Sequence, residues 1–218
     1  MNTKQSNTKE YKHFLYLLIF LPLLFWFYIC QQHLQPKYII HSKIDDYIPF
    51  LKVFIIPYLF WFFYIGIGLM YFGMKSKKDY FYLIKLIYIS MTVCYIIYCV
   101  LPSGQSLRPV IKNTDIFSRL VNFIYTIDPP TNVCPSLHVI DAISVNIVVW
   151  NSELFENNKK VKIISLICMI LICASTMFIK QHSIIDVFAG IGFSIVLYLS
   201  VYIVPELIQN REAKTNAK

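Results

Sequence analysis

Residues 53–72 read VFIIPYLFWFFYIGIGLMYF, an uninterrupted run of twenty residues without a charged side chain. A helix of this length reaches about 30 Å, which is the thickness of the hydrocarbon core of a bilayer. Because hydrocarbon accepts apolar side chains on every side of a helix, such a run needs no polar face. The stretch therefore predicts a membrane-spanning helix.

Further apolar runs lie on both sides of this stretch. Together they predict spans at about 13–30, 47–72, 80–101, 137–150, 161–179 and 184–208. The run at 137–150 is the weakest, because it is short and contains Asp141 and Asn146. In the longest polar connection, Ile116–Ile127 is expected to form a short helix at the membrane surface. No segment of the size of a soluble domain remains. We therefore expect an all-α fold, a polytopic membrane helical bundle with six transmembrane helices, forming a single domain over residues 1–218.

The composition agrees with a membrane protein. Hydrophobic residues make up 57% of the chain and charged residues 15%, whereas soluble domains are about half apolar and a quarter charged. The net charge of +8 comes from basic residues placed between the apolar runs, which favours attraction to anionic lipid and argues against nucleic acid as a partner. The six cysteines form no CxxC pair, so we expect neither a disulfide framework nor a zinc site. We also expect no cofactor.

The distribution of basic residues predicts an orientation. With the N-terminus inside, twelve basic residues fall in inner segments and six in outer ones, with Lys52 and Lys85 set aside near span ends. The inner set is Lys4, Lys9, Lys12, Lys75, Lys77, Lys78, Lys159, Lys160, Lys162, Arg211, Lys214 and Lys218, and the outer set is Lys37, Lys43, Arg108, Lys112, Arg119 and Lys180. Basic residues concentrate on the cytoplasmic side of membrane proteins. We expect a multi-pass protein of the cell membrane with both termini in the cytoplasm. The bias toward Lys, Ile, Asn and Tyr predicts a bacterial source, and the oligomeric state is left open.

Chemistry-bearing residues gather in two connections. With six spans, the segments after the third and the fifth span emerge on the same face. They contain Arg108-Pro109, then Pro135-Ser136-Leu137-His138, and then Lys180-Gln181-His182 followed by Asp186. Ionisable residues at a membrane boundary are costly to place without a function. Two histidines with an arginine and a lysine on one face predict an anion site with its own acid and base groups.

Spacing suggests a role for each residue. His182 and Asp186 are four residues apart, so on a helix they lie on one side, where the carboxylate can fix the imidazole tautomer. His182 is then a nucleophile toward phosphorus or a general base, and His138 a proton donor to the leaving oxygen. We expect Arg108, Lys180 and Ser136 to bind the phosphoryl oxygens.

Each residue also has a structural explanation when taken alone. His138 is then a packing residue, His182 and Asp186 form a helix cap, and Arg108 anchors a headgroup. Lys180 extends its stem toward the interface. The combination on one face is what favours a catalytic site.

These motifs resemble those of the type 2 phosphatidic acid phosphatase superfamily, which shares its site with vanadium haloperoxidases. The family patterns are Lys-x6-Arg-Pro, Pro-Ser-Gly-His and Ser-Arg-x5-His-x3-Asp. Here they correspond to Arg108-Pro109, to the segment ending at His138, and to Ser175 with His182 and Asp186, all within 102–190. The resemblance implies a phosphohistidine on His182, support from Asp186, His138 as general acid, and no metal.

The sequence departs from the family at three positions. Leu101 stands where the family has lysine, Leu137 where it has glycine, and Thr176 where it has arginine, with Lys180 nearby as a possible replacement for that charge. The third motif, Gln-His-x3-Asp-Val, is similar to that of sphingolipid headgroup transferases such as inositol phosphorylceramide synthases. In those enzymes the hydroxyl of an acceptor lipid attacks phosphorus, which would make His182 a base.

Three functions follow as hypotheses. The first is a metal-independent membrane phosphatase that hydrolyses a lipid phosphate or diphosphate, of the phosphatidate, phosphatidylglycerol phosphate or polyprenyl diphosphate type, at the extracytoplasmic face. The second is a lipid headgroup phosphotransferase. The third is a non-catalytic membrane protein that binds anionic lipids or transports a small anion.

Overall fold

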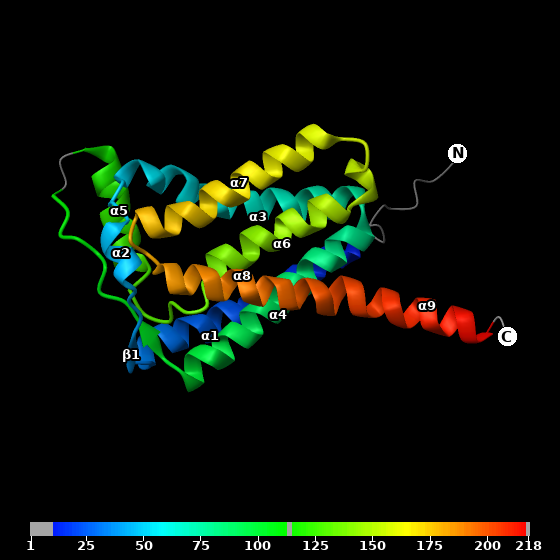
Figure 1. Cartoon of the computed structure of the whole chain (residues 1–218), viewed down its shortest axis with the longest axis horizontal. Coiled ribbons are helices and arrows are strands. Elements are labelled where there is room, and N and C mark those ends of the chain that lie inside the picture. The colour runs from blue at the N-terminus through cyan, green and yellow to red at the C-terminus, as the bar shows by residue number, and fades with distance from the viewer. Residues whose placement is uncertain (1–10, 113–114, 217–218) are drawn as a thin grey trace, which may run out of the picture.

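A computed structural model describes residues 11–112 and 115–216, and helices dominate its fold (Figure 1). The helices are η2 (Lys12–Ile19), α1 (Phe20–His33), α2 (Lys43–Tyr47), η3 (Lys52–Phe54), α3 (Ile55–Lys75), α4 (Lys77–Val100), α5 (Ile116–Ile127), α6 (Leu137–Asn151), η4 (Glu153–Phe155), α7 (Lys159–Phe178), α8 (Ile184–Tyr198), η5 (Leu199–Ile203) and α9 (Val204–Asn216). Two short strands, β1 (Tyr38–Ile39) and β2 (Ser103–Gly104), pair in parallel. The predicted all-α class is confirmed.

Five helices among the described residues are long and apolar enough to cross a bilayer. They cover Lys12–His33, Lys52–Lys75, Lys77–Val100, Lys159–Phe178 and Ile184–Ala213. Apolar side chains on their outer surfaces are exposed, for example Phe63 at 66% and Phe188 at 63%. Large apolar surfaces of this kind are stable against lipid and not against water. The length and composition of these helices are those of a membrane protein.

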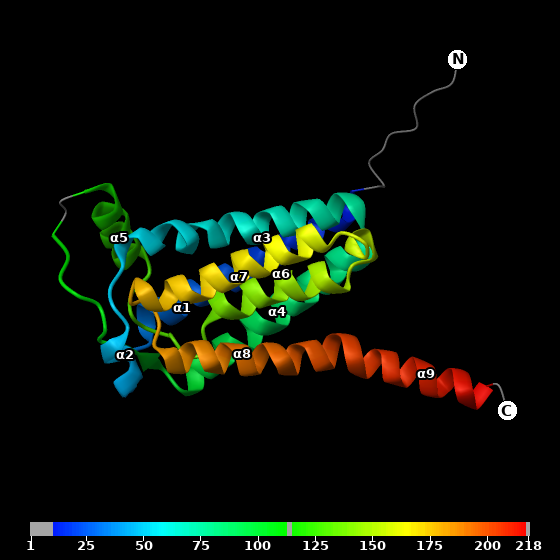
Figure 2. The ribbon, with the colours of Figure 1, turned by 45° about the horizontal axis from the view of Figure 1, so that its top comes forward.

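The predicted span at 137–150 corresponds to α6, which is shorter than the others. Its 15 residues rise about 22 Å, less than the thickness of a bilayer core. It lies inside the bundle, in contact with α3, α4, α7 and α8 (Figure 2). Its polar residues find partners there. The carboxylate of Asp141 accepts a hydrogen bond from the hydroxyl of Ser90 (3.2 Å), and the side-chain amide of Asn146 donates to the hydroxyl oxygen of Ser165 (2.9 Å). Because these polar side chains bond to neighbouring helices, they are compatible with a buried helix. They also explain why the hydrophobic pattern of 137–150 is weak.

One end of the bundle gathers three connections, 34–54, the described parts of the next one (101–112 and 115–136), and 179–183 (left in Figure 1). There β1 pairs with β2, and α5 lies across the ends of the long helices (Figure 1). The carboxylate of Asp115 accepts from the backbone N–H of Ser118 (3.1 Å), which begins α5 as an N-cap. The predicted short helix at Ile116–Ile127 is thus present.

Close packing of α8 against α6 depends on Gly190. A Cβ atom at this position would come within 3.1 Å of the carbonyl oxygen of Ser136 and 3.2 Å of the Val139 side chain. A larger residue would push the two helices apart. Glycine therefore lets the start of α8 approach the start of α6, and the two predicted histidines lie at these two starts.

Candidate active site

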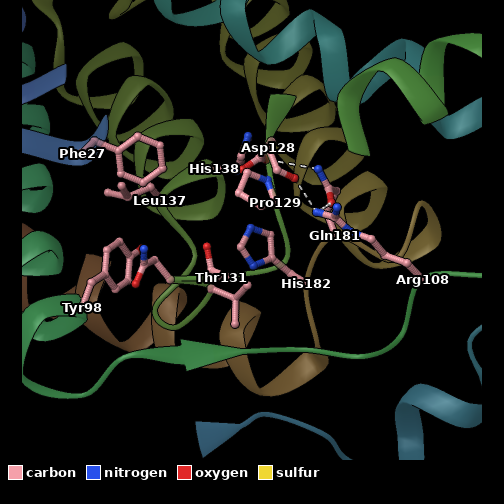
Figure 3. A pocket seen from close by; sticks show the side chains of 12 residues that line it. Phe27, Tyr98, Arg108, Asp128, Pro129, Thr131, Leu137, His138, Gln181 and His182 are labelled. Atoms are coloured by element: carbon pink, nitrogen blue, oxygen red, sulfur yellow. Dashed lines mark hydrogen bonds between the residues drawn. The ribbon is translucent and has the colours of Figure 1, made fainter. Parts of the chain in front are cut away.

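His138 and His182 meet in one pocket at the connection-rich end of the bundle. Their ring centroids are 5.6 Å apart and their planes cross at 61°. His138 lies in the first turn of α6, and His182 lies in the short turn between α7 and α8. Figure 3 shows the His182 ring between Thr131 and the pair formed by Gln181 and Arg108. The two connections that the sequence places on one face thus do lie together.

Asp186 lies beside His182 as the four-residue spacing predicts. The Nδ1 atom of His182 is 3.3 Å from Oδ2 of Asp186, whose side chain is fully buried. The same oxygen accepts from the backbone N–H of Ser183 (2.9 Å), which closes a capping box at the start of α8. The structural and the catalytic explanations of Asp186 therefore coexist. With Nδ1 directed to Asp186, the Nε2 atom of His182 is the nitrogen that remains for a ligand.

His138 is enclosed by aromatic rings from α3. Its ring centroid lies 4.8 Å from that of Tyr58 and 4.5 Å from that of Trp61. These contacts fix the plane of the imidazole and keep bulk water away from it. His138 thus has a defined orientation toward His182.

Arg108 lines the same pocket and organises its rim. Its Nη1 donates to the carbonyl of Tyr125 (3.1 Å), and its Nη2 donates to the carbonyl of Asp128 (2.6 Å) and to Oε1 of Gln181. The guanidinium also lies over the ring of Tyr125, 4.4 Å from its centroid. Burial lowers the pKa of Arg108, and the nearby Asp128 carboxylate opposes this change. Arg108 therefore gives the pocket a positive charge, although both of its Nη atoms already donate hydrogen bonds to the protein.

Asp128 and Gln181 are pocket residues to which the sequence assigned no role. The Oδ2 atom of Asp128 accepts from the hydroxyl of Tyr58 (2.9 Å) and from Nε2 of Gln181 (3.1 Å). Burial raises the pKa of Asp128, while the His182 ring, the Tyr58 hydrogen bond and Arg108 act in the opposite direction. Two features of the sequence could have indicated that these residues belong to the site. Asp128 precedes two prolines in the connection that also contains Arg108, and Gln181 is adjacent to His182.

Lys180 has a different position from the one expected of a phosphate ligand. Its backbone is in the left-handed region (φ 56°), and its ammonium donates to the carbonyls of Asp45 (2.7 Å) and Ile48 (2.5 Å). Lys180 does not line the pocket that holds the histidines. In this structure its charge ties the turn before α8 to the end of α2.

Asp45 completes that tie. Its carboxylate accepts from the hydroxyl of Ser183 (2.6 Å) and from the backbone N–H groups of Ile184 and Ser42 (2.8 Å each). One buried side chain thus caps both α2 and α8. No local sequence signal reveals this link, because Asp45 and Ser183 are 138 residues apart.

Ser136 begins α6 and is fully buried. Its backbone N–H donates to the carbonyl of Asp186 (3.2 Å), and its hydroxyl has no hydrogen-bond partner among the described residues. The neighbouring Cys134 thiol has its pKa raised to about 12 by burial and by the charge of Asp186. It is therefore a thiol at neutral pH, which argues against a role as nucleophile.

The pocket combines a paired histidine, a second imidazole, a guanidinium and several neutral donors in a cavity of about 40 Å³. This volume holds a few water molecules or the oxygens of a small anion. Within residues 11–112 and 115–216, no cluster of three or more His, Cys, Asp or Glu side chains is arranged to hold a metal ion.

Comparison with protein-family models, with curated proteins and with solved structures gave no match for this chain. The interpretation of the site therefore depends on its own geometry and chemistry.

Proposed function

We propose that this chain is a membrane enzyme that hydrolyses a lipid phosphate or diphosphate through a phosphohistidine on His182. The observation that carries the proposal is the pairing of His182 with the buried carboxylate of Asp186, in a histidine that lines the same pocket as His138. A histidine oriented by a carboxylate is an activated nucleophile or base. The motif resemblance to type 2 phosphatidic acid phosphatases points to the same chemistry.

The membrane arrangement in this proposal has six crossings. Five are the long apolar helices, and α6 is the additional one, fourth in chain order. As a central helix, α6 meets protein along most of its surface, so its short length and its polar residues are compatible with the hydrocarbon core. We place the connection-rich end outside the cytoplasm, because the opposite end carries the larger share of lysines. Both termini are then cytoplasmic, and the site faces the outer leaflet of a bacterial cell membrane.

The proposed reaction has two steps. First, Nε2 of His182 attacks phosphorus, the P–O bond to the lipid breaks, and His138 gives a proton to the leaving oxygen. Then water attacks the phosphohistidine, His138 takes up a proton from this water, and inorganic phosphate leaves. Asp186 holds the proton on Nδ1 throughout and stabilises the positive charge of the phosphorylated ring. Arg108 offsets the charge on the phosphoryl oxygens.

A second candidate is the transfer of a phosphorylated headgroup from one lipid to an acceptor alcohol. The observation in its favour is the charge of the pocket: Arg108 is the one described lining residue with a fixed positive charge, and Asp128 contributes a carboxyl group. A monoanionic phosphodiester needs less positive charge than a dianionic monoester. In this reaction His182 removes the proton of the acceptor hydroxyl, and no phosphohistidine forms.

The test is phosphate release from a panel of lipid phosphates by the purified protein in detergent. His182→Ala and His138→Ala should each abolish release, whereas His33→Ala, which changes an exposed histidine away from the pocket, should leave it intact.

Acid-labile, base-stable phosphate on His182 would support the phosphohistidine, and release should continue in the presence of a chelator. A new lipid product formed only with an added alcohol would favour the transferase. Equal activity of the wild type and His182→Ala would overturn both candidates, and binding of anionic lipid without turnover would favour a non-catalytic protein.

A further inference from the structure

The wall of the pocket contains buried polar atoms that the protein itself leaves without partners. Among the described residues, no hydrogen-bond partner exists for Nδ2 and Oδ1 of Asn132, Oγ1 of Thr131 or Nε of Arg108. All three residues line the pocket that holds His138 and His182. Figure 3 shows two of them, Thr131 and Arg108, beside the His182 ring. Asn132 is 5% exposed, so its amide can make few hydrogen bonds to bulk water.

The backbone holds Asn132 in this position. Its N–H donates to the carbonyl of Ser103 (2.6 Å), and two residues later the N–H of Cys134 donates to the hydroxyl of Ser103 (3.1 Å). Thr131 pairs with Gly104 in an antiparallel bridge. Asn132 itself adopts a left-handed conformation (φ 57°), which asparagine tolerates better than most residues. The segment is therefore anchored to β2, which limits how far the amide can turn toward water.

A buried side-chain amide whose nitrogen and oxygen both lack hydrogen-bond partners destabilises the folded protein. Such a group is expected where a ligand supplies the missing partners. An amide nitrogen donates to phosphoryl oxygens, and an amide oxygen accepts from a hydroxyl or a water molecule. Because the cavity measures only about 40 Å³, an occupant that reaches His182 also lies close to the other lining residues, Asn132 and Thr131 among them.

We propose that Asn132, with the hydroxyl of Thr131 beside it, binds the phosphoryl group of the substrate. This assignment rests on the proposed function. The sequence lacks the lysine and arginine of the family patterns at Leu101 and Thr176, and the ammonium of Lys180 is engaged with carbonyls elsewhere. Asn132 supplies a neutral donor in a pocket that is short of cations. Asn132 is then a binding residue that holds phosphorus in line with His182.

Vanadate, a phosphate analogue, tests this assignment by calorimetry on the purified full-length protein in detergent. Asn132→Gly keeps the left-handed backbone and removes the amide, so we expect vanadate to bind at least about tenfold more weakly while the melting temperature is unchanged or higher. Asn132→Asp keeps the shape and replaces the donor with an acceptor that repels anions, so binding should weaken further. The matched control is Asn146→Asp, since Asn146 is also buried but bonds to Ser165 outside the pocket. This variant should lose stability and bind vanadate like the wild type.

The possible failures are distinct. Wild-type affinity for vanadate in Asn132→Gly, in a protein that still hydrolyses a lipid phosphate, would overturn the role of Asn132 and leave the proposed function standing. Equal weakening in Asn132→Asp and Asn146→Asp would also overturn it, since the effect would then be a general loss of structure. A wild-type protein that neither binds vanadate nor releases phosphate would overturn the proposed function and the role of Asn132 together.

Discussion

Replacement of Asp186 by asparagine separates the helix cap that this carboxylate forms from the catalytic role that we propose for it. In the structure the Oδ2 atom of Asp186 accepts a hydrogen bond from the backbone N–H of Ser183 (2.9 Å) and lies 3.3 Å from Nδ1 of His182. Asparagine keeps the shape of the side chain and an oxygen that can cap α8. It removes the negative charge beside His182.

The expected loss of rate follows from the distance between the two groups. In the proposed mechanism Nε2 of His182 attacks phosphorus, and the ring of His182 becomes positively charged next to Asp186. At 3.3 Å and an effective dielectric constant of ~20, two unit charges attract by ~5 kcal/mol. At ~1.4 kcal/mol per factor of ten, this corresponds to a decrease in kcat of between about 10³-fold and 10⁴-fold. A similar replacement in a serine protease triad lowers kcat by about 10⁴-fold.

The assay measures kcat on the preferred lipid phosphate and the free energy of unfolding of the same preparations. Ser183→Ala is the control, because it removes the hydroxyl that caps Ile185 and bonds to Asp45 but leaves Asp186 beside His182. We expect Ser183→Ala to lose ~1–2 kcal/mol of stability and to keep kcat within about threefold of the wild type. Asp186→Asn should lose ~1 kcal/mol of stability and most of its activity.

Two outcomes would refute this reasoning. One is an Asp186→Asn protein whose kcat stays within about tenfold of the wild type, since the charge would then not contribute. The other is a parallel loss of activity and stability in both variants. Asp186 would in that case act only as a helix cap.

Three further predictions concern neighbouring features. Lys180→Met removes two charge-assisted hydrogen bonds to carbonyls, so we expect the free energy of unfolding to decrease by ~2 kcal/mol with little change in KM. An increased KM at unchanged stability would instead identify Lys180 as a phosphate ligand. Because burial raises the folded-state pKa of Asp128 above its usual value of about 4, its favourable contribution at low pH is lost as the pH rises through that raised value. The melting temperature of the wild type, compared with that of Asp128→Asn, should therefore fall as the pH rises above about 4, and a constant difference would contradict the burial argument. Val110 is fully exposed at the connection-rich end, so Val110→Cys should react with an impermeant maleimide in intact cells, above the wild-type background. Asn157→Cys, in the turn at the opposite end, should react only after lysis, and the reverse pattern would invert the proposed orientation.

Much of the fold was predictable because a bilayer imposes a simple length rule. The long apolar helices and the amphipathic α5 follow from hydrophobic runs and breakers. The proximity of His138 and His182 followed from counting spans, since every second connection returns to the same face. The length of α6 was harder to interpret, because a helix enclosed by four others needs neither a full span of apolar residues nor a lipid-facing surface.

The contacts around the site were less accessible to sequence reasoning. Lys180 is close in sequence to His182, yet its backbone is left-handed and its ammonium donates to the carbonyls of Asp45 and Ile48. Asp128 reaches the pocket through hydrogen bonds to Tyr58 and Gln181, which are 70 and 53 residues away. Such partners are set by tertiary packing, and no local pattern encodes them.

Thr176 contributes to the site through its backbone. The side chain of Thr176 bonds within α7, and its carbonyl accepts from the N–H groups of Gln181 (2.9 Å) and His182 (3.0 Å). This position therefore shapes the turn that presents His182 and adds no positive charge. The Nη atoms of Arg108 are engaged with carbonyls and Gln181, while its Nε has no partner among the described residues. In the proposed mechanism Arg108 therefore offsets the charge on the phosphoryl group together with neutral donors such as Asn132. Such a site matches substrates whose phosphate carries little negative charge, and for this reason phosphodiesters belong in the substrate panel beside the monoesters and diphosphates.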